Sequence, residues 1–280
     1  KASDVFGLGG ILCVILTGEA TYTDDLPEPR GMLHAAVGVS PHAHGTIARI
    51  DLAGVLAVPG VVAVLTPADI PGVNDIGPIQ RDDPILAERI VEFVGQPIFA
   101  VCANSVAVAR RAAMRAQIEI TPLPALLTID AALAAKSYVL PPVHVTRGDA
   151  ARALAAAPRR LSGRFACGGQ DHFYLEGQIA LAIPQERGGM RVYTSTQHPG
   201  EVQHMVARAL GMLDHDVVVE CRRMGGGFGG KETQMSLFAC VAALLARKTG
   251  RAVKLRLDRD DDMRSTGKRH AFQYDYDVGF

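Results

Sequence analysis

The stretch "VVVECRRMGGGFGGKE", Val217–Glu232, carries five glycines in the six positions from Gly225 to Gly230. The β-branched run before the glycines predicts a strand. The residues from about Lys231 onward repeat apolar side chains at helical spacing and end in basic residues and a glycine, which predicts a helix. A glycine loop between a strand and a helix presents backbone N–H groups at the positive end of the helix, an arrangement that suits an anion.

Two phosphate-binding patterns match this loop. Gly225, Gly230 and Lys231 satisfy the P-loop pattern, but Glu232 stands where that pattern needs a hydroxyl to hold Mg²⁺. A carboxylate at that place would repel a triphosphate, so the sequence argues against a P-loop.

The same loop also satisfies the dinucleotide fingerprint through Gly225, Gly227 and Gly230. Phe228 fills the position where pyrophosphate should approach bare backbone, and Asp258 is later than the expected ribose-binding acid. A dinucleotide-binding dehydrogenase module that uses the Gly225–Gly230 loop therefore remains the alternative from another class. A non-catalytic assembly domain is a third hypothesis.

The composition limits the possible partners. The 280 residues carry 29 Lys plus Arg against 29 Asp plus Glu, so no basic field favours nucleic acid or a membrane surface. Five scattered cysteines include no C-x-x-C, which indicates a reducing, cytoplasmic compartment and no zinc or iron–sulfur site. The apolar segment 5–16 is too short to cross a bilayer. Both ends are expected to lie inside a longer protein.

Strands interleaved with helices predict an α+β or α/β fold in two parts. Residues 17–121 form the first part, and residues 159–280 begin the second. Four prolines at 122, 124, 141 and 142 predict a connector over 122–158 with short helices at 131–136 and 149–157.

Six motifs follow one another along most of the chain. They read TGEATYTDDLP (17–27), VGQPIFAV (94–101), GGQDHFYLEGQIALAIP (168–184), STQHPGEVQHMVARALG (195–211), RRMGGGFGGKETQ (222–234) and STGKRH (265–270). In this order they closely resemble the molybdenum-binding, or molybdopterin, subunit of the xanthine dehydrogenase and aldehyde oxidase family. The resemblance implies an α/β hammerhead domain over 17–121 and the first part of a molybdopterin-binding domain over 159–280.

The resemblance also assigns roles around the glycine loop. The loop would close over the molybdenum of a molybdopterin-type cofactor, with the backbone of Gly229 near the metal and Phe228 beside the substrate. Gln197 would donate a hydrogen bond to an oxygen ligand of the metal, since an amide N–H₂ donates without adding charge. Gln197, Phe228 and Gly229 would thus approach molybdenum through its ligands rather than bind it directly.

Glu232 would hold the substrate heterocycle, because a carboxylate accepts from, or when protonated donates to, purine ring atoms. Related aldehyde oxidases generally lack this glutamate, so its presence favours hypoxanthine or xanthine over an aldehyde or another N-heterocycle. His172 and Glu176 are expected to be structural, and His198 and His204 to lie on a helix surface. The acidic run 258–263 is expected to form a solvated turn.

The implied reaction is the oxidation of hypoxanthine and xanthine to urate with oxygen from water. Electrons would pass to a 2Fe-2S cluster and FAD on a partner chain and then to NAD, within a dimer of heterodimers. The family's base glutamate and substrate arginine have no match within these residues, so the fragment alone is expected to be inactive.

Overall fold

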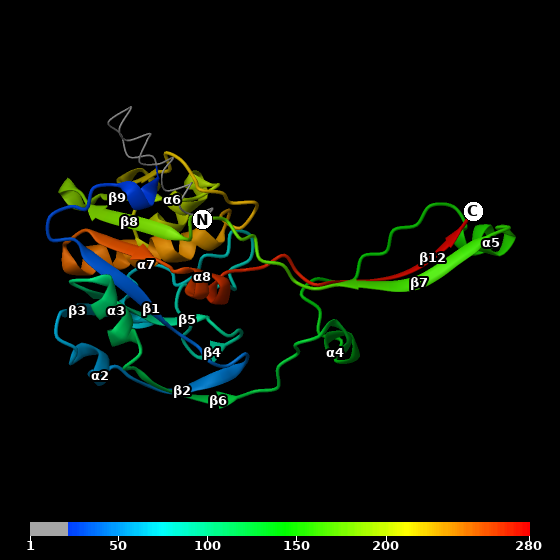
Figure 1. The fold of residues 1–280 in the computed structure, drawn as a ribbon, viewed down its shortest axis with the longest axis horizontal. Helices are drawn as coiled ribbons and strands as arrows, with labels where there is room; N and C mark the ends of the chain where they lie inside the picture. Colours follow the sequence, from blue (N-terminus) through cyan, green and yellow to red (C-terminus); the bar gives the residue numbers. More distant parts are fainter. Residues whose placement is uncertain (1–21) are drawn as a thin grey trace. The chain divides into compact units, whose positions relative to one another are not determined.

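The computed structural model describes residues 22–280, which form two compact units (Figure 1). The larger unit contains the described residues up to Leu123 together with His172–Gly267. The smaller unit contains Pro124–Asp171 and Lys268–Phe280. The predicted boundaries divide the chain into consecutive segments, whereas each compact unit draws on two separate stretches.

A seven-stranded sheet forms the centre of the larger unit, in the order β10-β9-β8-β11-β1-β5-β3. Its strands are β1 (Leu33–Val39), β3 (Val61–Leu65), β5 (Pro97–Ala103), β8 (Ile179–Pro184), β9 (Met190–Thr194), β10 (Val217–Glu220) and β11 (Val253–Arg256). Strand β1 pairs parallel with β11 and antiparallel with β5. The two sequence regions predicted as separate domains therefore contribute neighbouring strands to one sheet.

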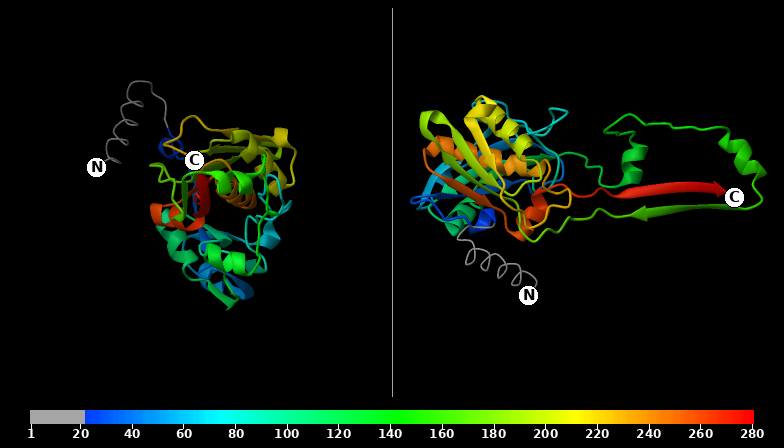
Figure 2. Two further views of the ribbon diagram at one scale, coloured as in Figure 1. Left: turned by 90° about the vertical axis from the view of Figure 1, so that its right-hand side faces the viewer. Right: turned by 90° about the horizontal axis from the view of Figure 1, so that it is seen from above.

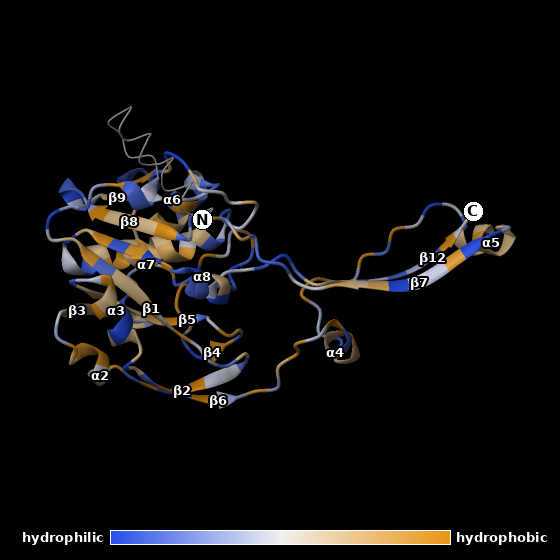
Figure 3. Cartoon of the chain, viewed as in Figure 1, coloured by the Kyte–Doolittle hydropathy of each residue, from blue (hydrophilic) through white to orange (hydrophobic). Residues whose placement is uncertain are grey.

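Helix α7 (Gln234–Thr249) supplies much of the core of this unit. Every residue from Met235 to Ala246 is buried, because the helix packs against β8, β11 and α6 (Pro199–Leu210). A helix that is apolar on nearly all sides is stable only when it is covered in this way. Figure 3 shows the same apolar character along β8.

The remaining elements of the larger unit are shorter. Strand β2 (Gly45–Asp51) pairs with β4 (Ile90–Val91) and β6 (Gln117–Pro122) in a three-stranded sheet. The helices are α2 (Ala53–Leu56), α3 (Val106–Ala113) and α8 (Arg259–Ser265). Short 3-10 helices lie at η1 (Thr23–Asp25), η2 (Pro67–Asp69), η3 (Glu186–Gly188) and η4 (Asp214–Asp216).

The smaller unit is built on one antiparallel ribbon. Strands β7 (Arg160–Cys167) and β12 (Phe272–Gly279) run side by side in Figure 2 and pair along their whole length. Tyr274 lies opposite Phe165 and Asp275 opposite Arg164, so one face of the ribbon is apolar and the other charged. The two predicted helices are present as α4 (Ile129–Ala134) and α5 (Ala150–Ala156).

Candidate functional site

The glycine loop connects β10 to α7 through a backbone that few sequences can adopt. Gly226, Phe228 and Gly229 have φ angles of 96°, 53° and 87°. For Phe228 this left-handed conformation costs on the order of 1–2 kcal/mol. Its side chain is nevertheless 73% exposed, and its ring lies over Gly226, where an added Cβ would come within 3.0 Å of it. The loop therefore holds a large apolar side chain out in the open.

Helix α7 begins three residues later than predicted. The sequence places its start near Lys231, but the helix starts at Gln234 with Thr233 as its N-cap. Lys231 is kept out of the helix because its backbone N–H and C=O both bond to Gln197. Glu232, placed by the sequence in the first helical turn, thus precedes the helix.

Gln197, between β9 and α6, holds the far side of the loop. Its Oε1 accepts from the backbone N–H of Gly229 at 2.9 Å and of Lys231 at 3.2 Å. Two donors on one atom identify that atom as the oxygen, since an amide nitrogen could not accept them. The Nε2 of this exposed residue has no hydrogen bond to any residue that the structure describes, so it can donate to a ligand.

The loop directs some of its N–H groups inward and leaves others free. The N–H of Gly225 donates to Glu176 Oε2 at 2.8 Å, and that of Gly230 to the Gly227 carbonyl at 2.7 Å. The N–H of Gly229 donates to Gln197 Oε1. The N–H groups of residues 226–228 form no hydrogen bond within the described part of the chain.

Two of the glycines are required by close packing. A Cβ on Gly227 would lie 2.6 Å from Gln197 Oε1, and one on Gly230 would lie 2.7 Å from the rings of His172 and Tyr174. Real Cβ atoms do not approach other atoms this closely. His172, expected to be structural, lines the loop, and its ring stacks on that of Tyr174.

A buried charged pair, Lys231 and Glu176, lies next to the glycine loop and bonds to it. Lys231 is fully buried, and its Nζ donates to the Glu176 carbonyl at 2.6 Å and to Ser195 Oγ at 2.7 Å. The Glu176 carboxylate lies 3.6 Å from the same Nζ and accepts from Ser195 Oγ at 2.6 Å. Burial lowers the pKa of Lys231 from its ordinary value, while the charge of Glu176 opposes this shift. The lysine of the P-loop-like pattern therefore points into the protein.

The acidic run 258–263 was expected to form a solvated turn; Asp258 and Asp260 are exposed as expected, but the run is helical rather than a turn. It forms most of α8, and Asp262 is buried, accepting from Tyr174 Oη and from the backbone N–H of Gln178, each at 2.7 Å. The Gln178 amide in turn donates to the Gly230 carbonyl at 2.9 Å. Burial and this carboxylate raise the pKa of Tyr174 above its ordinary value. The apolar pattern before position 258 does not predict this hydrogen-bond network, because the network joins residues that are far apart in the sequence.

The remaining predicted residues lie on the surface. Glu232 is exposed, with no hydrogen bond or ion pair to a residue in the described range, and is therefore accessible to a ligand. His198 precedes α6, and His204 pairs with Asp214 at 2.9 Å, so both are surface residues as predicted.

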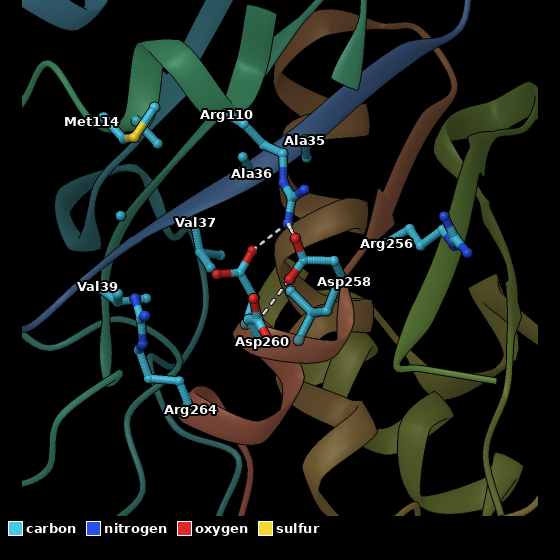
Figure 4. A pocket seen from close by; sticks show the side chains of 14 residues that line it. Ala35, Ala36, Val37, Val39, Arg110, Met114, Arg256, Asp258, Asp260 and Arg264 are labelled. Atoms are coloured by element: carbon cyan, nitrogen blue, oxygen red, sulfur yellow. Dashed lines mark hydrogen bonds and ion pairs between the residues drawn. The ribbon is translucent and has the colours of Figure 1, made fainter. Parts of the chain in front are cut away.

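A separate pocket of about 470 Å³ lies between β1, α3 and α8. Figure 4 shows Arg110 pointing toward Asp258, and it also pairs with Asp261 at 2.5 Å. Arg256 and Arg264 point away from this pair. The charges at the centre of the pocket are thus joined in ion pairs that fix the start of α8.

Across residues 22–280, no group of three or more His, Cys, Asp or Glu is placed to hold a metal ion. No helix in that range is long and apolar enough to cross a membrane.

The donors around the loop fit a group rich in oxygen atoms. The N–H groups of residues 226–228 and Gln197 Nε2 are all available to donate, and a side chain at Gly227 would collide with Gln197. Backbone N–H groups converging in such a loop form a concave site for anionic oxygens. The residues present therefore fit a molybdopterin-type cofactor, whose metal carries oxygen ligands.

Comparisons with known proteins agree in both halves of the chain. Residues 134–280 match the molybdopterin cofactor-binding domain, and residues 17–124 match the aldehyde oxidase and xanthine dehydrogenase a/b hammerhead domain. Xanthine dehydrogenase/oxidase of Mus musculus is 42% identical over 265 residues, and xanthine dehydrogenase of Oryza sativa subsp. japonica is 40% identical over 269 residues. These matches cover 94% and 95% of this chain but only 20% of either relative, so the chain spans about a fifth of their length.

Solved structures give the same result. The aldehyde oxidoreductase from Desulfovibrio gigas aligns with a TM-score of 0.84 at 29% identity, covering 95% of this chain and 31% of that protein. Quinoline 2-oxidoreductase from Pseudomonas putida 86 aligns with a TM-score of 0.82 at 30% identity, covering 96% of this chain and 36% of that one. The chain therefore belongs to the aldehyde oxidase and xanthine dehydrogenase family, with a hammerhead domain followed by a molybdopterin-binding domain.

Proposed function

We propose that this chain is part of a molybdenum hydroxylase that oxidises hypoxanthine and xanthine to urate. The observation that carries the proposal is that Gln197 bonds to the backbone of Gly229 and Lys231. The exposed Glu232 follows directly after Lys231. The loop and its two neighbouring residues thus carry an exposed aromatic ring, Phe228, and an exposed carboxylate, Glu232, and Gln197 adds a neutral donor bonded to the same segment. The names of the relatives at 42% and 40% identity support a purine as substrate.

Each of these residues has a distinct task in the proposal. When bound, the cofactor would supply the two-electron oxidation with water as the oxygen source. Gln197 Nε2 and the N–H groups of residues 226–228 would donate to oxygen atoms of the cofactor, which holds its orientation without adding charge. The exposed ring of Phe228 would pack against the flat substrate, and Glu232 would bond to purine ring nitrogens.

The electron path belongs to the same proposal. The oxidation releases two electrons, for which we propose a 2Fe-2S cluster and FAD on a partner chain, NAD as the final acceptor, and a dimer of heterodimers. The four described cysteines are all free, and Cys102 and Cys240 are buried. Free thiols suit the cytoplasmic location that we propose.

A second substrate class is kept because of the structural comparisons. The likeness to quinoline 2-oxidoreductase and to aldehyde oxidoreductase supports another N-heterocycle or an aldehyde as the alternative.

The dinucleotide-binding alternative gains no support from the sheet order. Strands β10 and β11, which flank the loop and α7, are separated by β9 and β8, whereas a dinucleotide fold places such strands side by side.

The substrate assignment is tested by Glu232→Ala and Glu232→Gln in the complete enzyme. For a purine, kcat/KM should fall by roughly 10- to 150-fold in Glu232→Ala, which corresponds to the loss of a charge-assisted hydrogen bond of about 1.5–3 kcal/mol. Turnover of an aromatic aldehyde should change less than about threefold, because it offers no ring N–H to the carboxylate.

Molybdenum and iron per chain, measured by elemental analysis on each preparation, control for loss of the cofactor. Equal losses on purine and aldehyde at unchanged molybdenum content would exclude the purine assignment. Absence of molybdenum from the native complex would exclude the hydroxylase itself.

A further inference from the structure

Lys231 connects three segments of the chain that lie far apart in the sequence. Its ammonium group bonds to Glu176 and Ser195, and it lies 4.6 Å from the centre of the Tyr174 ring. Its backbone bonds to Gln197 on both sides, because its N–H donates to Oε1 and its C=O accepts from the Gln197 N–H at 2.8 Å. Lys231 thus links the buried residues Glu176 and Ser195, through its side chain, to the exposed Gln197, through its backbone.

The orientation of the Gln197 side-chain amide depends on the backbone of Lys231. Only the N–H groups of Gly229 and Lys231 bond to its Oε1 among the described residues. If the backbone at Lys231 moves, the oxygen loses these donors and Nε2 turns with it. The orientation of the free donor is therefore set by a lysine whose own side chain points away from the loop surface.

Ser195 in this cluster has no catalytic geometry of its own. Its Oγ bonds to both Lys231 and Glu176, which resembles an activated serine, but the residue is fully buried. A nucleophile needs access to its substrate. The cluster is therefore closed to solvent, and its effect is limited to the residues of the chain to which it bonds.

A buried ion pair is a weak source of stability, because desolvation offsets the attraction between the charges. An apolar replacement of similar volume often leaves a fold equally stable. What a charged pair adds is a fixed geometry, since each group must keep its partners. Glu176 also accepts from the Gly225 N–H at the start of the loop, so the pair fixes both ends of the glycine run.

We propose that Lys231 and Glu176 are positioning residues, which hold the Gly225–Gly230 loop and thereby direct Gln197 Nε2 toward the cofactor. The assignment rests on the proposed function for the identity of the ligand, but not for the anchoring of the loop. The pair touches neither cofactor nor substrate, and acts through Gln197.

The test uses the complete enzyme with the double replacement Glu176→Gln/Lys231→Met, which removes both charges and leaves an amide oxygen to accept from Gly225. Lys248→Met is the matched control, because Lys248 also bonds to a carboxylate, Asp69, and to a backbone carbonyl, but from the other end of α7. Hydrogen exchange of the peptide 222–234 reports the loop directly and needs no turnover. Steady-state kinetics are measured with Gln197 intact and with Gln197→Ala.

The double variant should exchange peptide 222–234 at least about tenfold faster than the parent and should lose about tenfold in kcat, the range typical of residues that orient groups around a metal. In the Gln197→Ala background the same replacement should change kcat less than about twofold. Lys248→Met should alter neither readout.

Unchanged exchange in the double variant would overturn the proposal whatever the parent's activity. A loss in kcat of equal size with and without Gln197 would also overturn it, because the pair would then act by another route. If the parent contains no molybdenum, the proposed function fails, while the exchange measurement still decides whether the pair holds the loop.

Discussion

At position 227 the choice of residue is decided by one oxygen atom. A Cβ there would lie 2.6 Å from Gln197 Oε1, so any larger residue must displace the amide that holds Gly229. Phe228 shows the opposite case, since a residue poorly suited to a left-handed backbone is kept there and remains exposed. Strain of this kind is maintained by surrounding bonds and is often found at functional positions.

Gly227→Ala should therefore reduce purine kcat/KM in the complete enzyme by at least about tenfold, since its Cβ would displace the Gln197 amide and with it Nε2. Gly200→Ala is the control, because that glycine lies in α6 with open space around its Cβ position, and alanine there should stabilise the helix by about 0.5–1 kcal/mol. Steady-state kinetics and thermal melting of both variants check this. Parent-like kinetics in Gly227→Ala would show that the amide tolerates displacement.

Among the elements, α8 has a larger role than its seven residues suggest. One side of its first turns pairs with Arg110 on α3, and Asp262 on the same helix reaches Tyr174 and Gln178 beneath the glycine loop. Helix α8 thus connects α3, through Arg110, to Tyr174 and Gln178, which lie next to the glycine loop. Asp262 is buried although the acidic sequence predicts solvent exposure, because Tyr174 and the backbone N–H of Gln178 donate to its carboxylate.

Tyr174→Phe should lower the stability of the chain by about 1–3 kcal/mol, because it removes the donor to Asp262 and the acceptor of Gln178 inside the protein. The melting temperature should fall by about 2–4 °C for each kcal/mol. Tyr276→Phe, on the ribbon of the smaller unit and 40% exposed, should melt as the parent does. Equal melting of the two variants would show that the Asp262 bond is not required.

At the scale of the whole molecule, the sheet and the loops differ in how firmly they are held. Strands from both sequence regions share the seven-stranded sheet, and the glycine loop is bonded at Gly225, Gly229 and Gly230. Residues 137–148 in the smaller unit form no helix or strand and are exposed throughout. Segments without buried contacts open most readily.

Limited digestion with trypsin should therefore cut this chain first at Lys136 and Arg147, and only later at the exposed Arg223 beside the glycine loop. Mass spectrometry of the early fragments identifies the sites. First cleavage at Arg223 would mean that the bonds to Glu176 and Gln197 do not hold the loop.

The sequence by itself determined the local elements and the family. The strand before the loop, helix α7 and the two short helices α4 and α5 were all predicted, because hydrophobic periodicity and glycine or proline breaks act over a few residues. Ordered motifs then identified the family that the comparisons confirm. The roles of Gln197, Phe228, Gly229 and Glu232 stay proposals.

Only the tertiary structure decided the features that depend on distant contacts. The pairing of Leu33 with Val253 joins residues that no local pattern relates, and it unites two predicted domains in one sheet. Lys231 is buried because Glu176 and Ser195 bond to its side chain, and no local pattern around the glycine motif predicts these partners. Where a charged group lies depends on the partners that the fold brings to it, because an unpaired charge cannot be buried.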